Sequence, residues 1–413
     1  MPITDNDLMA KMGEGGSVQL TPLSNKLCIN GETKPYSVYK IKLNELRYNV
    51  QNDRIATWVS EYDSQNNGEL PDDVEELNNI IENFIVESNP QAIKKTQDDI
   101  DRNTQQEPAV VLNNGVLIDG NRRFTCLRRL AKENPKFGWI EAIILPPETM
   151  DDKKAIKVLE LSIQHGKDSK VDYDPIDRLV GVYKDVIKEE LLTEEEYAQA
   201  SNISLGEVRK MINRAQYLAD FLEFINAPEK FYLARKMKLS GPINEIEAIL
   251  KNVNGVEEQE RVKNCIFANL IVEPAGDMTR FIRKFKKILK SSGSAVFVEK
   301  ESELTERVVD KLADLDNVTV ESIRDNIRND INLADEFESV LQESDRSVRG
   351  QKITESSNSK IIKAAEMLRE VDVSLLKTLS GDDFKQTMSA CEELRIKVEE
   401  ITSFIEQEMD EKE

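Results

Sequence analysis

The order of apolar and polar positions divides the chain into a mixed α/β part and a long helical part. Residues 36–43 alternate between polar and apolar side chains, which is typical of a strand. Residues 71–73 precede apolar positions at helical spacing, and their acidic side chains favour a helix start. Two β-branched runs flank residues 113–115, which predicts a hairpin. A helix is expected after Gly120, and residues 139–145 are expected to form a further strand.

From residue 150 onward the spacing is helical almost throughout, with a polar break at residues 356–359. Apolar side chains between Phe384 and Ile405 recur every three or four residues, a narrow seam suited to a coiled coil or a helical hairpin. We therefore predict an α+β fold, with a small mixed-sheet N-terminal domain followed by all-α domains. The predicted boundaries are a flexible arm (1–35), the mixed-sheet domain (36–170), a DNA-binding helical domain (171–245), a helical domain with a basic helix (246–300) and an acidic helical region (301–413).

Composition limits the location and the chemistry. No apolar run reaches the roughly 18 residues of a membrane span, and no secretory signal is visible, so we expect a cytoplasmic protein with no membrane partner. The four cysteines form no CxxC pair, and a single histidine, His165, excludes His-rich zinc sites. We predict no metal-binding side chains, and we interpret His165 as a polar residue at a helix end.

The distribution of charge changes the picture more than its total. A net charge of −21 over 413 residues argues against a nucleic-acid binder, because phosphate contacts need Lys and Arg. Residues 1–180 sum to −8, residues 181–300 to +1, and residues 301–413 to −14. The middle third is therefore not acidic, and a local DNA contact there stays open.

The segment 117–131 places Gly120 at the end of a strand and Arg122-Arg123 at the start of a helix. A helix N-terminus offers unpaired backbone N–H groups to an anion. Two guanidinium groups at the same place favour a phosphate or a carboxylate. The alternative is a solvated basic turn that pairs with the acidic helix at residues 72–87.

This turn resembles the GERR box of the ParB N-terminal domain, in the ParB/sulfiredoxin superfamily. Residues 41–46 with Arg54 resemble the first box of that family, residues 161–165 fall at its third box, and residues 174–178 resemble the segment that opens its next helix. The resemblance covers roughly residues 36–240. It implies a domain that binds CTP with magnesium and works as a nucleotide-driven clamp on DNA. The nucleotide-binding residues that it implies are Gly120, Asn121, Arg122, Arg123, Gln164 and Arg54.

Several positions depart from the family pattern. Asn121 stands in place of the Glu of GERR, and Leu161 and Ser162 replace the Glu and Asn of the third box, which argues against metal-dependent CTP hydrolysis. A sulfiredoxin would need a catalytic cysteine where Asn121 stands. Residues 119–123 also resemble the DGQQR turn of nucleases and NTPases in modification and defence systems, so an enzyme stays an alternative.

Residues 192–215 match a helix-turn-helix. Thr193 and Glu196 predict a capping box, Asn202 suits the tight turn, and Ser204 with Glu207 predicts a second box. The second helix would lie in the major groove. The DNA-binding candidates are Ser204, Leu205, Arg209, Lys210, Asn213 and Arg214. The alternative is a generic helical pair with a basic face.

The sequence thus favours a ParB-like, nucleotide-responsive protein that binds double-stranded DNA, is nucleoid-associated, and acts in plasmid, phage or chromosome partition or in a related regulatory or defence role. A homodimer is expected from the C-terminal seam and by analogy, whereas a ParA-type ATPase partner is left open. The basic helix at residues 280–290 could contact DNA backbone or present a solvated face. The alternatives are an NTPase or nuclease, and a helix-turn-helix repressor with a degenerate nucleotide site.

Overall fold

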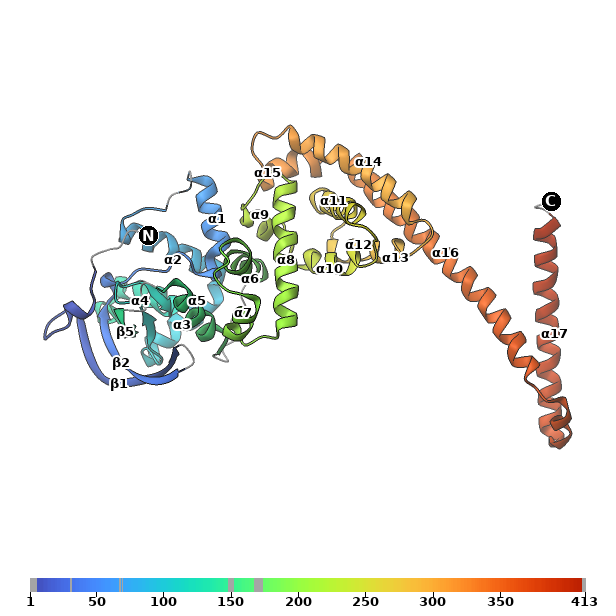
Figure 1. The fold of residues 1–413 in the computed structure, drawn as a ribbon, viewed down its shortest axis with the longest axis horizontal. Coiled ribbons are helices and arrows are strands. Elements are labelled where there is room, and N and C mark those ends of the chain that lie inside the picture. Colours follow the sequence, from blue (N-terminus) through green and yellow to red (C-terminus); the bar gives the residue numbers. More distant parts are fainter. Residues whose placement is uncertain are drawn as a thin grey trace. The chain divides into compact units, whose positions relative to one another are not determined.

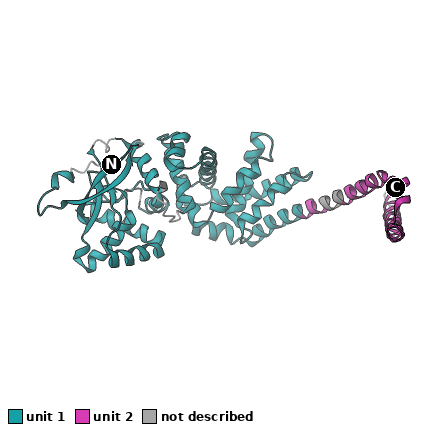
Figure 2. Ribbon diagram, turned by 90° about the horizontal axis from the view of Figure 1, so that it is seen from below, with its two compact units in different colours: residues 1–345 teal, residues 346–413 magenta. Residues whose placement is uncertain are grey.

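The computed structural model describes residues 6–29, 32–66, 68, 70–147, 152–166 and 174–410. The chain divides into two units, residues 1–345 and 346–413 (Figure 2). The first unit contains a small mixed sheet followed in the sequence by many helices (Figure 1). The second unit contains the end of one long helix and the whole of another. The predicted α+β class is confirmed.

Five strands form one sheet in the order β1-β2-β5-β3-β4. The strands are β1 (Val18–Ile29), β2 (Glu32–Lys42), β3 (Ala109–Val111), β4 (Leu117–Asp119) and β5 (Trp139–Ile144). β3 pairs with β5 in parallel, and the other neighbouring pairs are antiparallel. The predicted strands near residues 36–43 and 139–145 are present, as is the hairpin around residues 113–115.

The helices before residue 240 are α1 (Ala56–Gln65), α2 (Val74–Ser88), α3 (Pro90–Asn103), α4 (Asn121–Glu133), α5 (Lys153–Gly166), α6 (Pro175–Val182), α7 (Glu194–Ser201), α8 (Leu205–Phe224) and α9 (Phe231–Lys236). Those from residue 240 onward are α10 (Ser240–Leu250), α11 (Val256–Val272), α12 (Met278–Arg283), α13 (Phe285–Ile288), α14 (Ser294–Ala313), α15 (Val320–Ile323), α16 (Ile331–Arg369) and α17 (Gly381–Asp410). Within the described residues, no helix is both long enough and apolar enough to cross a membrane.

The sheet separates two apolar cores because successive side chains of a strand point to opposite faces. On β3, Ala109 and Val111 join the larger core with α2, α3 and α4, whereas Val110 joins a smaller core. Leu159 and Ile163 of α5 close that smaller core. Both faces of the β3–β4 hairpin are therefore covered, which fixes the loop that follows β4.

The N-terminal segment differs from its prediction as a flexible arm. Residues 18–29 form β1, which pairs with β2 along its length apart from a register shift between Leu20 and Ser24. Most β1 side chains are exposed or half-buried, and Val18 is the buried exception. Backbone pairing with β2 holds most of this edge strand, and only a few of its apolar side chains, Leu27 and Ile29 among them, pack against a core.

Two helical predictions also need correction. α16 continues through residues 356–359, where a polar break was predicted, because Ser and Asn lower helix propensity without blocking the backbone bonds. The predicted basic helix at residues 280–290 is divided between α12 and α13, which meet at Lys284. α17 spans the predicted seam, and its Phe384 and Val398 are 50% and 55% exposed. The homodimer stays a prediction.

Candidate functional site

The turn between β4 and α4 has the geometry of an anion-binding loop. Gly120 is the N-cap of α4 at φ = 101°, a left-handed conformation that favours glycine. A Cβ atom on Gly120 would lie 2.7 Å from the Ala109 Cβ, so the position also lacks room for a side chain. No side chain caps this helix, which leaves the backbone N–H groups of its first turn available to a ligand.

All six predicted nucleotide-binding residues line one cavity of about 260 Å³. Gly120, Asn121, Arg122 and Arg123 come from the turn, while Arg54 and Gln164 reach the cavity from elements far away in the sequence. The rest of its wall comes from the C-terminal half of α3, the segment that follows it, and residues of β4 and α5. The structure thus brings together every residue of this prediction in one place.

The electrostatic surroundings of Arg122 favour an anion beside its guanidinium group. Burial lowers the pKa of Arg122, and the neighbouring charges of Arg54 and Arg123 lower it further. Among the described residues no carboxylate forms an ion pair with Arg122. The Asn121 Oδ1 and Arg123 Nε atoms are buried without a hydrogen-bond partner in the same part of the chain. A phosphate would offset the repulsion and satisfy donors at this place.

Arg123 is held differently. Its guanidinium group contacts Asp119 at 2.9 Å and Glu107 at 3.4 Å, and both carboxylates line the cavity. These ion pairs hold the Arg123 side chain at the mouth of the turn. Arg123 therefore has internal partners that a bound phosphate would have to share or displace, whereas Arg122 has none among the described residues.

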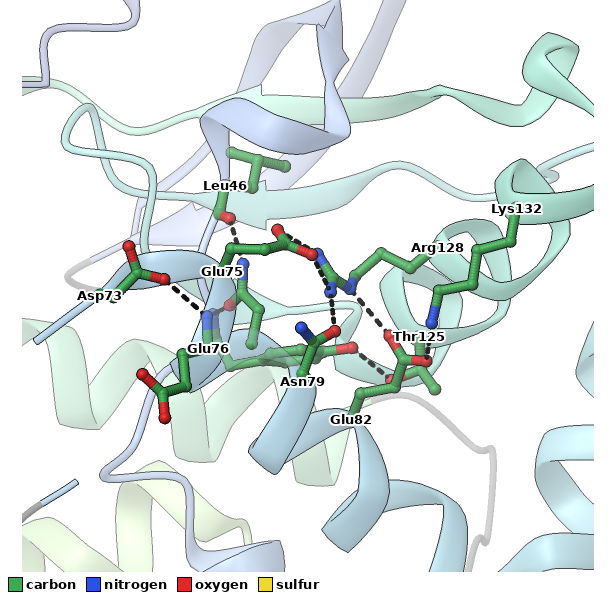
Figure 3. Close-up of polar contacts among 11 residues, drawn as sticks. Leu46, Asp73, Glu75, Glu76, Asn79, Glu82, Thr125, Arg128 and Lys132 are labelled. Atoms are coloured by element: carbon green, nitrogen blue, oxygen red, sulfur yellow. Dashed lines mark hydrogen bonds and ion pairs between the residues drawn. The ribbon is translucent and has the colours of Figure 1, made fainter. Parts of the chain in front are cut away.

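The alternative of a turn paired with the acidic helix is wrong for these two arginines. The acidic side chains of α2 instead bind Arg128, one helical turn and a half further along α4 (Figure 3). Arg128 contacts Glu82 at 2.8 Å and Glu75 at 3.0 Å, and Lys132 contacts Glu82 at 3.1 Å. This network fixes α4 against α2 and leaves the first turn of α4 facing the cavity.

A smaller cavity of about 50 Å³ adjoins the first and shares Arg54, Asn121 and Arg122 with it. Isoleucine side chains of η3 (Asp53–Ile55), α2 and α3 form much of its wall, together with Asn49, Asn52 and Asn89. A ligand held through its phosphate at Arg122 would therefore meet both apolar and amide groups on this side.

A buried charge cluster that sequence reasoning missed lies behind the cavity. The Lys157 Nζ atom is 2.8 Å from Asp53, 3.1 Å from Asp185 and 3.6 Å from Glu160. Burial raises the pKa of Glu160 and of Asp185, against the effect of Lys157. Burial alone would lower the pKa of Lys157, but the three carboxylates raise it well above its usual range.

This cluster supports two walls of the cavity. Asp53 directly precedes Arg54, and the Gln164 Nε2 atom donates to Glu160 at 3.1 Å. The Asp185 carboxylate forms an ion pair with Lys157, and the Asp185 backbone carbonyl accepts from the Leu192 backbone N–H, two residues before α7. The signal in the sequence is weak, since the four residues are spread over more than 130 positions.

The two helices predicted for DNA binding are present as α7 and α8. Thr193 and Glu196 form the predicted capping box, and Asn202 adopts the left-handed conformation at φ = 53°. Ser204 caps α8, but the second capping box is incomplete. The Glu207 side chain pairs with Lys210 at 2.6 Å instead. α8 extends to Phe224, well beyond the predicted motif.

The DNA-binding candidates lie on one stretch of α8. Ser204, Arg209, Lys210 and Asn213 are exposed, whereas Leu205 and Arg214 are half-buried. Two of the basic side chains have carboxylate partners: Arg209 contacts Glu194 at 2.8 Å, and Lys210 contacts Glu207. The surface is accessible, but part of its positive charge is neutralised within the chain.

Two further observations concern metals and His165. Among the described residues, no group of three or more His, Cys, Asp or Glu side chains is arranged to hold a metal ion. Of the carboxylates at the cavity, Asp119 and Glu107 already bind Arg123. His165 belongs to α5, but its side chain lies outside the described part of the structure.

Comparison with known proteins gives a distant likeness among solved structures. No family model and no curated protein matches this chain. Among solved structures, the chain is similar to one described as a Pnob8-like ParB-N domain, with 14% sequence identity and a TM-score of 0.32. The match covers 64% of this chain and 97% of that one. These values do not assign the chain to a family.

Proposed function

We propose that this chain is a ParB-like DNA-binding protein whose sheet domain binds a nucleotide through its phosphates. The observation that supports this proposal most is the convergence of Gly120, Asn121, Arg122, Arg123, Arg54 and Gln164 on one cavity. Within it, Arg122 is half-buried beside two other arginines and has no carboxylate partner among the described residues. Such a site favours an anion with several oxygen atoms.

CTP is the nucleotide that the family resemblance implies, and the residues present suit its phosphates. Three neighbouring guanidinium groups and the backbone N–H groups in the first turn of α4 supply donors to phosphate oxygens. Few carboxylates of the cavity are available to magnesium, because Asp119 and Glu107 already bind Arg123. We therefore propose that any magnesium ion enters with the nucleotide, held mainly by phosphate oxygens and water, as is usual for this ion.

The DNA contact is proposed for the N-terminal half of α8. Arg209 and Asn213 are exposed on one helix and can make bidentate contacts with guanine and adenine. Asn202 and the caps of both helices set the turn that presents this half of α8. Partition of a plasmid, phage or chromosome is the proposed biological role, with a related regulatory or defence role as its variant.

Calorimetric titration of the full chain with CTP, ATP and GTP, with and without magnesium, tests the nucleotide proposal. We expect CTP to bind, and Arg122→Ala to bind it at least about tenfold more weakly. Failure of all three nucleotides to bind would favour the alternative of a repressor with a degenerate nucleotide site. Turnover of ATP or GTP that Arg122→Ala abolishes would favour the NTPase or nuclease alternative.

DNA binding is tested separately with Arg209→Ala/Lys210→Ala at fixed salt concentration. We expect the double variant to weaken binding to a selected site and to lose preference at the base that Arg209 contacts. Lys26→Ala/Lys40→Ala removes the same charge from exposed positions of the β1–β2 hairpin and serves as the control. Unchanged affinity in the α8 variant would refute the assignment of α8.

A further inference from the structure

The segment Met278–Lys290 is the strongest uninterrupted basic stretch in a chain of net charge −21. It contains six basic residues and no acidic one, and it forms α12 and α13 in the first unit. The basic residues are Arg280, Arg283, Lys284, Lys286, Lys287 and Lys290. The basic side chains of such a stretch either pair with carboxylates of the same chain or lie on a solvent-exposed surface. The side-chain contacts show which of the two applies to each residue.

Burial separates the two kinds of side chain in this segment. Phe281, Ile282, Phe285 and Ile288 are all at most 4% exposed, and the Phe285 ring packs against Phe297 with ring centroids 4.9 Å apart. Since these apolar residues anchor both short helices, the basic side chains between them must point away from the core. The break at Lys284 does not disturb this division.

The lysines at the end of the segment have no partner in the described part of the chain. Arg283 contacts Glu245 at 2.6 Å and Arg280 approaches Asp277 at 3.7 Å. By contrast, Lys286, Lys287 and Lys290 are exposed and form no ion pair with any described carboxylate. We call these three residues the α13 lysine cluster.

This cluster differs from the basic residues of α8. Arg209 and Lys210 each have a carboxylate within 2.8 Å, so a DNA phosphate must compete with Glu194 and Glu207 there. At the α13 lysine cluster a phosphate would meet no such competition. The affinity for DNA of any sequence depends on the number of phosphates that the protein neutralises. The unpaired lysines of the α13 lysine cluster are therefore expected to contribute more of this affinity than Arg209 and Lys210.

The packing of the first unit connects the two surfaces. α10 packs against α8 and also against α12 and α13, so one helix links α8 to both short basic helices (Figure 1). Resting on the proposed DNA-binding function, we propose that the α13 lysine cluster is a second DNA contact, which binds the phosphate backbone beside the site that α8 reads. It contributes affinity without sequence preference.

The test is the triple variant Lys286→Ala/Lys287→Ala/Lys290→Ala in the full chain. Affinity for a selected site and for unrelated duplex DNA is measured by fluorescence anisotropy from 50 to 300 mM salt. The control Lys26→Ala/Lys40→Ala/Lys94→Ala changes net charge equally at exposed lysines on β1, β2 and α3. Thermal unfolding of both variants checks that the exposed substitutions leave the fold intact.

We expect the triple variant to bind both DNAs more weakly, with the site preference unchanged and the slope of log K against log salt reduced by about 2 to 3. An unchanged slope, or an equal reduction in the control variant, would overturn the proposal while leaving the α8 assignment intact. If the wild-type chain binds no duplex DNA even at 50 mM salt, the proposed DNA-binding function fails, and this inference fails with it.

Discussion

Replacement of Arg122 by alanine separates a ligand-binding role from a structural one, because the two predict opposite effects on stability. Burial and the charges of Arg54 and Arg123 both act against the cationic form of Arg122 in the free protein. No described carboxylate compensates for them. Removing the side chain should therefore leave the midpoint of thermal unfolding unchanged or raise it, as at other sites where function and stability conflict.

The effect on ligand binding is expected to be large. A hydrogen bond to a charged group contributes about 1.5 to 3 kcal/mol, which corresponds to a roughly 10- to 150-fold weaker Kd for a phosphate-bearing ligand. Arg122→Lys keeps the charge but loses the planar fork of the guanidinium group, so it should show an intermediate loss. The ordering wild type, Arg122→Lys, Arg122→Ala is itself a prediction.

Calorimetry with CTP and with inorganic triphosphate measures the affinity, and differential scanning fluorimetry of the free protein measures stability. Arg129→Ala is the matched control, since Arg129 is an exposed arginine on the same helix whose Nε donates to Gln97 at 3.2 Å. A Kd for Arg122→Ala within threefold of wild type would refute the anion site. A fall of several degrees in its unfolding midpoint would show that Arg122 supports the fold instead.

Three further predictions concern a buried acid, the turn and α8. Burial raises the pKa of Glu301 to about 8, so the stability that its neutral form provides is complete below about pH 4.5 and is lost as the pH rises toward 8, by up to about 1.4 kcal/mol per pH unit. Glu301→Gln can keep the hydrogen bond from Asn269, so it should flatten the dependence of the unfolding free energy on pH between pH 5 and 8. A denaturation profile that this variant leaves unaltered would contradict a neutral Glu301. Gly120→Ala should lower the free energy of unfolding by about 1 to 3 kcal/mol through its positive φ and its contact with β3, and a urea midpoint equal to wild type would contradict this. Glu194→Gln should strengthen DNA binding by freeing Arg209, as anisotropy at fixed salt would show, whereas weaker binding would indicate that the pair orients the arginine.

The elements that the sequence predicts well are those whose signal is local. The hairpin at residues 113–115, the glycine before α4 and the caps of α7 all depend on backbone conformations that few residue types adopt. The same holds for the turn between β4 and α4, because Gly120 and the two arginines that follow Asn121 form a short-range pattern at a strand-to-helix junction. That Arg54 and Gln164 join it depended on the family resemblance, since no local pattern connects them.

The features that escaped prediction depend on tertiary contacts. β1 buries little apolar surface, so its existence follows from backbone pairing with β2 rather than from alternation. The cluster around Lys157 combines carboxylates from three separate elements, and only the folded chain shows that Asp53, Glu160 and Asp185 face one ammonium group.

Ion pairing changes what the charge distribution implies about DNA binding. A count of basic residues makes α8 and the segment at residues 278–290 look alike, but Arg209 and Lys210 each pair with a carboxylate. The attraction of α8 for a phosphate is therefore reduced, which suits a surface that discriminates between bases rather than one that holds any duplex. If the α13 lysine cluster supplies the attraction instead, affinity and sequence preference are carried by separate helices. Substitutions could then change one without the other, as a double-variant cycle between Arg209 and Lys287 would show by its additivity.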